Sequence, residues 1–449
     1  MAELLWSLQD SQLVARFQRR CGLFPAPDEG PSENGAGPAD GEARTPELGH
    51  LPAAKGKGAG EPANGLRRLA APQDTQKLLE TFESPCPFPL AFSLKWCREE
   101  RLRTCLIPET LSGIFWTHSL YPQAYVQKYV VKNYFYYYLF RFSAALGQEV
   151  FYITFLPFTH WNIDPYLSRR LTIIWVLVMY IGQVTKEILK WPRPFSPPVV
   201  KLEKRVIAEY GMPSTHAMAA TAISFTLLIS TMDRYQYPFV LGLMMAVVFS
   251  TLVGLSRLYT GMHTVLDVLG GILITAILIV LTYPAWTLID RLDSASPLFP
   301  VCVLVVPFFL CYNYPVSDYY SPTRADTTTI MAAGAGVTIG FWINHFFQLV
   351  SEPTESLPVI QNIPPLTTDL LVLGLAKFTV GIVLILLVRQ LVQKLSLQVL
   401  YSWFKVVTRN KEARRRLEIE VPYKFVTYTS VGICATTFVP MLHRFLGLL

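Results

Sequence analysis

The sequence predicts an all-α protein that crosses a membrane several times as a bundle of helices. Of its 449 residues, 51% are hydrophobic and only 16% are charged, a composition too apolar for an ordinary soluble protein. About 20 apolar residues suffice to cross a hydrocarbon core of roughly 30 Å. We place about nine such spans at 134–158, 171–189, 215–233, 238–256, 264–284, 297–313, 328–350, 369–389 and 423–442.

The chain before the first span is expected to lie outside the membrane. Leucines at helical spacing stand beside Arg16, Arg19 and Arg20, which favours a short amphipathic helix on a membrane surface over a secretory signal. The rest of region 1–70 is dense in Pro, Gly, Ala and Glu and is expected to be a disordered tail. Region 71–131 is an ambiguous linker, since its longest apolar stretch is short for a span.

Charge and cysteine content narrow the possible ligands. The net charge is +7, and the basic residues are scattered through loops, so we expect no nucleic-acid partner. Anionic lipid or a phosphate ligand fits better. The seven cysteines contain no CxxC pair, which indicates neither a disulfide framework nor a zinc site.

Ionisable residues at span ends cost free energy and are therefore functional candidates. The first group lies at the end of the second span, where Lys186 is followed by Arg193 and Pro194. The proline biases Arg193 toward an extended backbone. Both cations can equally be read as ordinary anchors on the cytosolic side of a helix end.

The second group, Ser214, Thr215 and His216, begins the third span. A helix start presents free N–H groups to an anion, and His216 in its first turn can donate a proton to a leaving oxygen. Plain helix capping by Ser214 and Thr215 is the alternative. Capping does not explain His216.

The third group, Arg257, His263 and Asp267, joins the fourth and fifth spans. If the fifth span starts near His263, the spacing of four places His263 and Asp267 on one helix face. The carboxylate can then accept the Nδ1 proton and leave Nε2 free as a nucleophile. A purely structural His–Asp pair is the alternative.

Span order brings the three groups to one membrane face, because the first ends span two, the second begins span three and the third joins spans four and five. That face would combine cations for a phosphate with a nucleophile and an acid. The groups include no carboxylate cluster suited to Mg²⁺, so we expect no metal and no cofactor, with cations neutralising the phosphate instead.

The patterns K-x6-RP, PSTH and SR-x5-H-x3-D resemble the three-part signature of the type 2 phosphatidic acid phosphatase superfamily. That family most often has PSGH, and Thr215 in place of the glycine is similar to its sphingosine-phosphate phosphatase branch. The stretches WPRPFSPPVVKLE, EYGMPSTHAM and SRLYTGMH resemble the same branch. The resemblance implies a catalytic transmembrane core at 132–290, followed by C-terminal transmembrane helices at 291–449.

In that family, the residue matching His263 attacks phosphorus and forms a phosphohistidine. The resemblance implies that Asp267 orients this imidazole and that His216 protonates the leaving alkoxide. It further implies that the phosphate oxygens are bound by Lys186, Arg193, Ser214, Arg257 and the Thr215 amide.

The expected function is metal-independent hydrolysis of a membrane-embedded sphingoid base phosphate, such as sphingosine-1-phosphate or its dihydro form. A lipid headgroup phosphotransferase and a non-enzymatic membrane transporter or scaffold are the alternatives.

The resemblance implies a multi-pass endoplasmic reticulum protein with a lumenal site. Positive-inside counting of the basic segment 405–416 favours a cytosolic site, unless one span between Arg324 and Lys405 is miscounted. Arg324 and Asp326 are expected on the catalytic face, as contacts for the substrate amine, as a gate, or as a surface salt pair.

Overall fold

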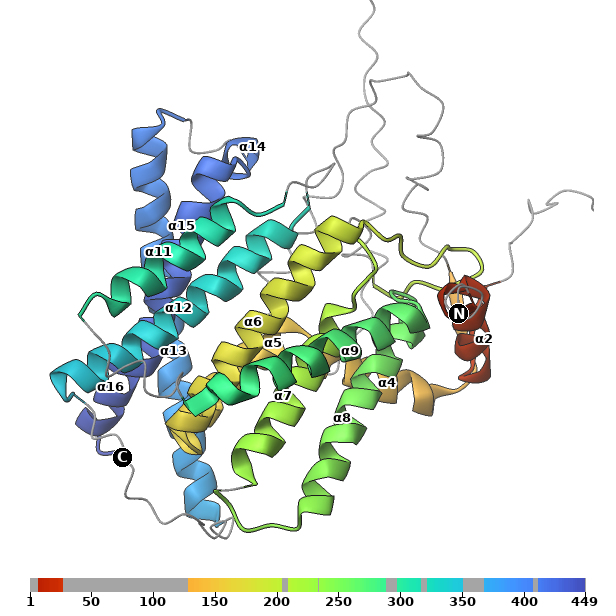
Figure 1. The fold of residues 1–449 in the computed structure, drawn as a ribbon, viewed down its shortest axis with the longest axis horizontal. Coiled ribbons are helices and arrows are strands. Elements are labelled where there is room, and N and C mark those ends of the chain that lie inside the picture. Colours follow the sequence, from red (N-terminus) through yellow and green to blue (C-terminus); the bar gives the residue numbers. More distant parts are fainter. Residues whose placement is uncertain are drawn as a thin grey trace, which may run out of the picture. The chain divides into compact units, whose positions relative to one another are not determined.

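The computed structural model describes residues 7–26, 128–203, 209–232, 234–287, 297–315, 321–349, 367–406 and 411–448. Regular structure in these ranges is helical (Figure 1) apart from one antiparallel sheet, in which β1 (Leu23–Pro25) pairs with β2 (Tyr129–Val131). The all-α prediction is therefore confirmed. The predicted disordered tail and most of the ambiguous linker lie outside the described residues.

The first group of helices follows β2 along the chain. Its members are α4 (Tyr134–Leu146), α5 (Glu149–Asn162), α6 (Pro165–Leu189), α7 (Thr215–Thr231), α8 (Phe239–Tyr259), α9 (Val265–Thr282) and the short 3₁₀ turn η4 (Tyr283–Ala285). Helix α7 contacts α6, α8 and α9, and Figure 1 shows these helices running alongside one another. Alanines at 217, 219, 220 and 222 are buried on α7, and such small side chains allow close approach by several neighbours.

The second group comprises α11 (Phe299–Tyr312), α12 (Thr323–Phe347), α13 (Thr368–Trp403), α14 (Lys411–Arg414), α15 (Leu417–Ile433), the π-helical turn η6 (Cys434–Phe438) and α16 (Val439–Phe445). Helix α12 packs on α11 and α15, and it also contacts α6. Through that contact the second group lies beside the first. Apolar side chains on α13 are largely exposed and would face lipid in a bilayer.

Each of the nine predicted spans falls on helical chain, but the count of nine is not confirmed. Among the described residues, six helical segments are long and apolar enough to cross a membrane: 165–189, 239–259, 265–285, 323–347, 368–403 and 417–445. Helices α7 and α11 are apolar but shorter. The prediction of a bundle with several membrane-spanning helices still holds.

The predicted span 134–158 is wrong as one continuous helix, because the chain breaks between α4 and α5. Gln148 has an extended backbone with ψ 157°, which interrupts the helical hydrogen bonds. A side chain at Gly147 would approach Val253 to 2.9 Å and the His216 ring to 3.3 Å. The break therefore allows this corner to pack against His216.

The N-terminal helix α2 (Ser11–Arg20) lies in the stretch where an amphipathic helix was expected. Its Asp10 side chain accepts a hydrogen bond from the Gln12 N–H at 2.8 Å and so caps the helix. Val14, Ala15 and Gln18 on α2 are buried against the protein. One face of this helix is thus part of the folded protein.

Candidate active site

The three predicted groups of residues meet at one end of α6, α7, α8 and α9. The Ser214 N–H donates to the Asp267 carbonyl at 3.0 Å, which joins the second group to the third. Lys186 Nζ donates to Thr215 Oγ1 at 3.2 Å, which joins the first to the second. The convergence that span order predicted is therefore present.

Ser214 is the N-cap residue of α7, yet its side chain makes no capping hydrogen bond. Its Oγ is buried and has no hydrogen-bond partner among the described residues. Capping, the alternative left open by the sequence, does not describe this side chain. A buried hydroxyl beside free helix N–H groups can instead bind an anion.

The predicted pairing of His263 with Asp267 required a helix that starts near His263, and α9 begins at Val265, just after it. Thr264 is the N-cap and Asp267 the third helical residue of a capping box, in which Asp267 Oδ2 accepts from the Thr264 N–H at 2.7 Å. His263 Nδ1 is 3.8 Å from the same oxygen, which is too long for a hydrogen bond. The two side chains are neighbours, with His263 Nδ1 and Asp267 Oδ1 both unpaired within the described part of the chain.

Burial is the main cause that lowers the pKa of His263 well below its ordinary value, and the charges of Arg193, Lys186 and Arg257 lower it further. A neutral imidazole is therefore favoured at physiological pH. Only the neutral ring has a nitrogen lone pair for attack. The cations that would bind an anion also keep this ring nucleophilic.

Arg193 connects the exit of α6 to the loop before His263. Its Nη1 donates to the Met262 carbonyl at 2.8 Å, and its Nε donates to the Glu209 carbonyl at 2.8 Å. Both bonds hold backbone beside the site. Arg193 thus positions the loop as well as supplying positive charge.

Arg257 has a different environment. Its Nη2 donates to Glu203 Oε2 at 2.7 Å, whereas Nε and Nη1 are buried without hydrogen-bond partners among the described residues. Unpaired buried donors are rare in proteins and call for an explanation. Nε and Nη1 present their N–H groups on different edges of the guanidinium, and each is a charged donor that a phosphate oxygen can accept from.

Comparisons with known proteins agree with this geometry. Residues 169–290, which include all three groups, match the PAP2 superfamily. Sphingosine-1-phosphate phosphatase 2 of Homo sapiens is 80% identical over 100% of both chains. Sphingosine-1-phosphate phosphatase 1 of Rattus norvegicus is 40% identical over 70% of this chain and 73% of its own.

The chain belongs to the sphingosine-1-phosphate phosphatase family. A dihydrosphingosine 1-phosphate phosphatase of Schizosaccharomyces pombe is more distant, at 29% identity over 45% of this chain and 51% of its own. The resemblance seen in the motifs is confirmed, and the full-length match to the human protein favours its type 2 form. No solved structure matches the chain.

The sequence interpretation missed two carboxylates in this member of the sphingosine-1-phosphate phosphatase family. Glu203 pairs with Arg257, and Glu209 Oε2 lies 3.3 Å from Arg193 Nη2 and 3.6 Å from Lys186 Nζ. A signal was present, because buried cations need counter-charges and both glutamates stand between the first two motifs. Their contacts depend on the loop path, which the spacing does not define.

Of the roles left open for Arg324, its contacts favour a salt pair over a contact with the substrate amine. Its Nη2 pairs with Glu420 Oε2 at 2.7 Å and donates to the Arg415 carbonyl at 3.1 Å, so it ties α12 to the start of α15. The same contact places Arg324 and the basic segment at one end of the bundle. A miscounted span between Arg324 and Lys405 therefore does not resolve the conflict over orientation.

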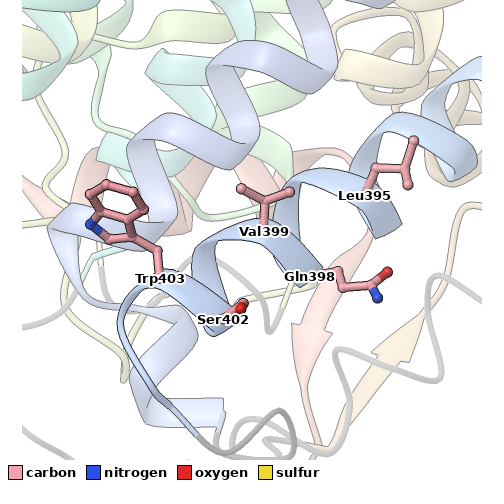
Figure 2. A pocket seen from close by; sticks show the side chains of 5 residues that line it. All are labelled: Leu395, Gln398, Val399, Ser402 and Trp403. Carbon is pink, nitrogen blue, oxygen red and sulfur yellow. The ribbon is translucent and has the colours of Figure 1, made fainter.

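A surface hollow elsewhere does not fit a phosphate. Figure 2 shows its lining residues, all on α13: Leu395, Gln398, Val399, Ser402 and Trp403. None of them is charged. Within the described ranges, no three His, Cys, Asp or Glu side chains gather in a way that could hold a metal ion.

Proposed function

We propose that this chain hydrolyses sphingosine-1-phosphate, and its dihydro form, to the sphingoid base and inorganic phosphate. The observation that carries the proposal is a set of buried groups with no hydrogen-bond partner among the described residues, namely Ser214 Oγ and two nitrogens of Arg257. They belong to the motifs that meet with His263 at one end of α6, α7, α8 and α9. The names of the similar phosphatases support the choice of a sphingoid base phosphate.

In the first half of the reaction, His263 Nε2 attacks phosphorus in line with the ester bond. The P–O bond to the lipid breaks, and His216 donates its proton to the departing alkoxide. Charge on the phosphoryl oxygens is stabilised by Lys186, Arg193, Arg257 and the helix start at Ser214 and Thr215.

Asp267 stabilises the positive charge that His263 acquires when the phosphohistidine forms. The separation of 3.8 Å between His263 Nδ1 and the carboxylate would shorten on substrate binding, as catalytic hydrogen bonds commonly do. Water then attacks phosphorus while His216 accepts its proton. The P–N bond breaks and phosphate leaves.

Hydrolysis without a metal follows from this arrangement, since three cations and helix N–H groups carry the phosphate charge. The lipid chain would remain in the bilayer, because the candidate site lies at the ends of apolar helices at headgroup depth. We also propose that the protein resides in the endoplasmic reticulum membrane with this site toward the lumen. An N-glycosylation acceptor inserted near Arg415 tests the orientation, because only lumenal segments would be modified.

The test of function is phosphate release from sphingosine-1-phosphate by membranes that contain the protein, with EDTA present. The native chain is expected to be active and His263→Ala inactive. His345→Ala is the matched control, since His345 is exposed on α12. Loss of activity in EDTA, or an active His263→Ala variant, would contradict the mechanism, and phosphate recovered on an added alcohol would indicate a phosphotransferase.

A further inference from the structure

The two glutamates at the site differ from the cations in exposure. The side chains of Lys186, Arg193 and Arg257 are 2%, 6% and 1% exposed, whereas Glu203 and Glu209 are 16% and 17% exposed. The carboxylates therefore lie on the more open side of the cations. A substrate that enters from this side meets the carboxylates as well as the cations.

Glu203 does not have to move when a phosphate binds. It uses only Nη2 of Arg257, at 2.7 Å, and Nε and Nη1 have no partner in the described part of the chain. A phosphate can accept a hydrogen bond from one of these nitrogens while the ion pair stays intact. Glu203 is accordingly a positioning residue that fixes the plane of the guanidinium.

Glu209 is in the opposite situation. Its Oε2 lies between two cations at 3.3 Å and 3.6 Å, both longer than usual for a charge-assisted hydrogen bond. Lys186 also contacts Thr215 at the start of α7, where a phosphate would bind. A phosphate dianion at this position competes with the single charge of Glu209 for the same cations.

When a bound phosphate takes over the two cations, the partly buried carboxylate of Glu209 is left without an ion-pair partner. It then needs a new cation nearby. Sphingoid base phosphates carry one, because an ammonium group is bonded to the carbon next to the one that bears the phosphate ester. We propose that Glu209 binds this ammonium and makes the site prefer sphingoid base phosphates to lipid phosphates that lack an amine. The inference rests on the proposed function and names the residue behind its substrate preference.

The test compares sphingosine-1-phosphate with an analogue in which a hydroxyl replaces the ammonium. The native protein is expected to prefer the ammonium substrate in kcat/KM by about tenfold or more, the value of one charge-assisted hydrogen bond. Glu209→Gln is expected to abolish this preference by raising KM for sphingosine-1-phosphate only. Glu209→Asp, which keeps the charge, should retain part of it.

Glu203→Gln is the matched control, because it removes a nearby carboxylate that does not meet the ammonium. It should lower kcat/KM for both substrates by the same factor.

The inference is overturned if the native protein hydrolyses both substrates equally, or if Glu209→Gln keeps the preference. It is also overturned if Glu209→Gln improves both substrates alike, since Glu209 would then only compete with phosphate. Native protein that releases phosphate from neither substrate would refute the proposed function itself.

Discussion

Replacing Arg257 by lysine tests the phosphate site while keeping its charge. In the native protein one guanidinium nitrogen is bound to Glu203 at 2.7 Å, and the other two are buried with no partner within the described ranges. A lysine ammonium is a single point and cannot bind Glu203 and at the same time place donors at the separate positions of Nε and Nη1. At least one phosphate contact is therefore lost in Arg257→Lys.

A hydrogen bond to a charged group contributes about 1.5–3 kcal/mol. Loss of one such bond predicts a fall in kcat/KM of about 10- to 150-fold, since about 1.4 kcal/mol corresponds to a factor of ten. The assay is initial-rate phosphate release from sphingosine-1-phosphate by purified protein in detergent. Thermal unfolding of the same sample shows whether the variant is folded.

Arg389→Lys is the control, because Arg389 on α13 lies over the ring of Tyr428 on α15 and belongs to none of the three motifs. This change is expected to leave kcat/KM unaltered. A folded Arg257→Lys protein with kcat/KM within about threefold of native would refute the reasoning, since one such bond is worth tenfold or more. The free nitrogens of Arg257 would then not bind the phosphate.

Three further predictions concern His263 and the N-terminal helix. Because the pKa of His263 is lowered by burial and by nearby cations, activity should persist below pH 6.5; a kcat/KM profile that loses activity with a pKa at or above the ordinary value of about 6.5 would contradict this. The free energy of unfolding should nevertheless decrease below about pH 6.5, because His263 binds a proton in the unfolded chain at a pH where it stays neutral in the folded protein. Gln18→Ala removes three hydrogen bonds, to both backbone groups of Val200 and to the Tyr259 carbonyl at 2.7–3.0 Å, and should cost about 1–3 kcal/mol; an unchanged thermal unfolding midpoint would refute that role.

Much of the candidate site could be predicted because helices that cross a membrane alternate in direction. Lys186 ends one span and Ser214 begins the next, so the order of the spans alone predicts that both lie on the same side of the membrane. In the folded protein, the hydrogen bond from Lys186 to Thr215 joins the two. The roles of the individual motif residues stay predictions until variants are measured.

The rest depends on backbone details that hydropathy does not record. The break at Gly147 lies inside a stretch that is apolar overall, and one extended residue, Gln148, interrupts the helix there. Glu203 and Glu209 lie in irregular chain with no period to reveal which way they face. His263 precedes α9 because Thr264 and Asp267 form the capping box, which moves the helix start by one position.

The attachment of α2 has a consequence for the timing of synthesis. Gln18 is separated from Val200 by 182 positions and from Tyr259 by 241, so its partners are made long after it leaves the ribosome. At about 5–20 residues per second, the wait for Tyr259 is between about 12 and about 48 s. A helix of ten residues is too short to be stable alone in water, so α2 acquires its final structure only after α8 is made. The beginning of the chain is thus among the last parts of the catalytic end to assemble.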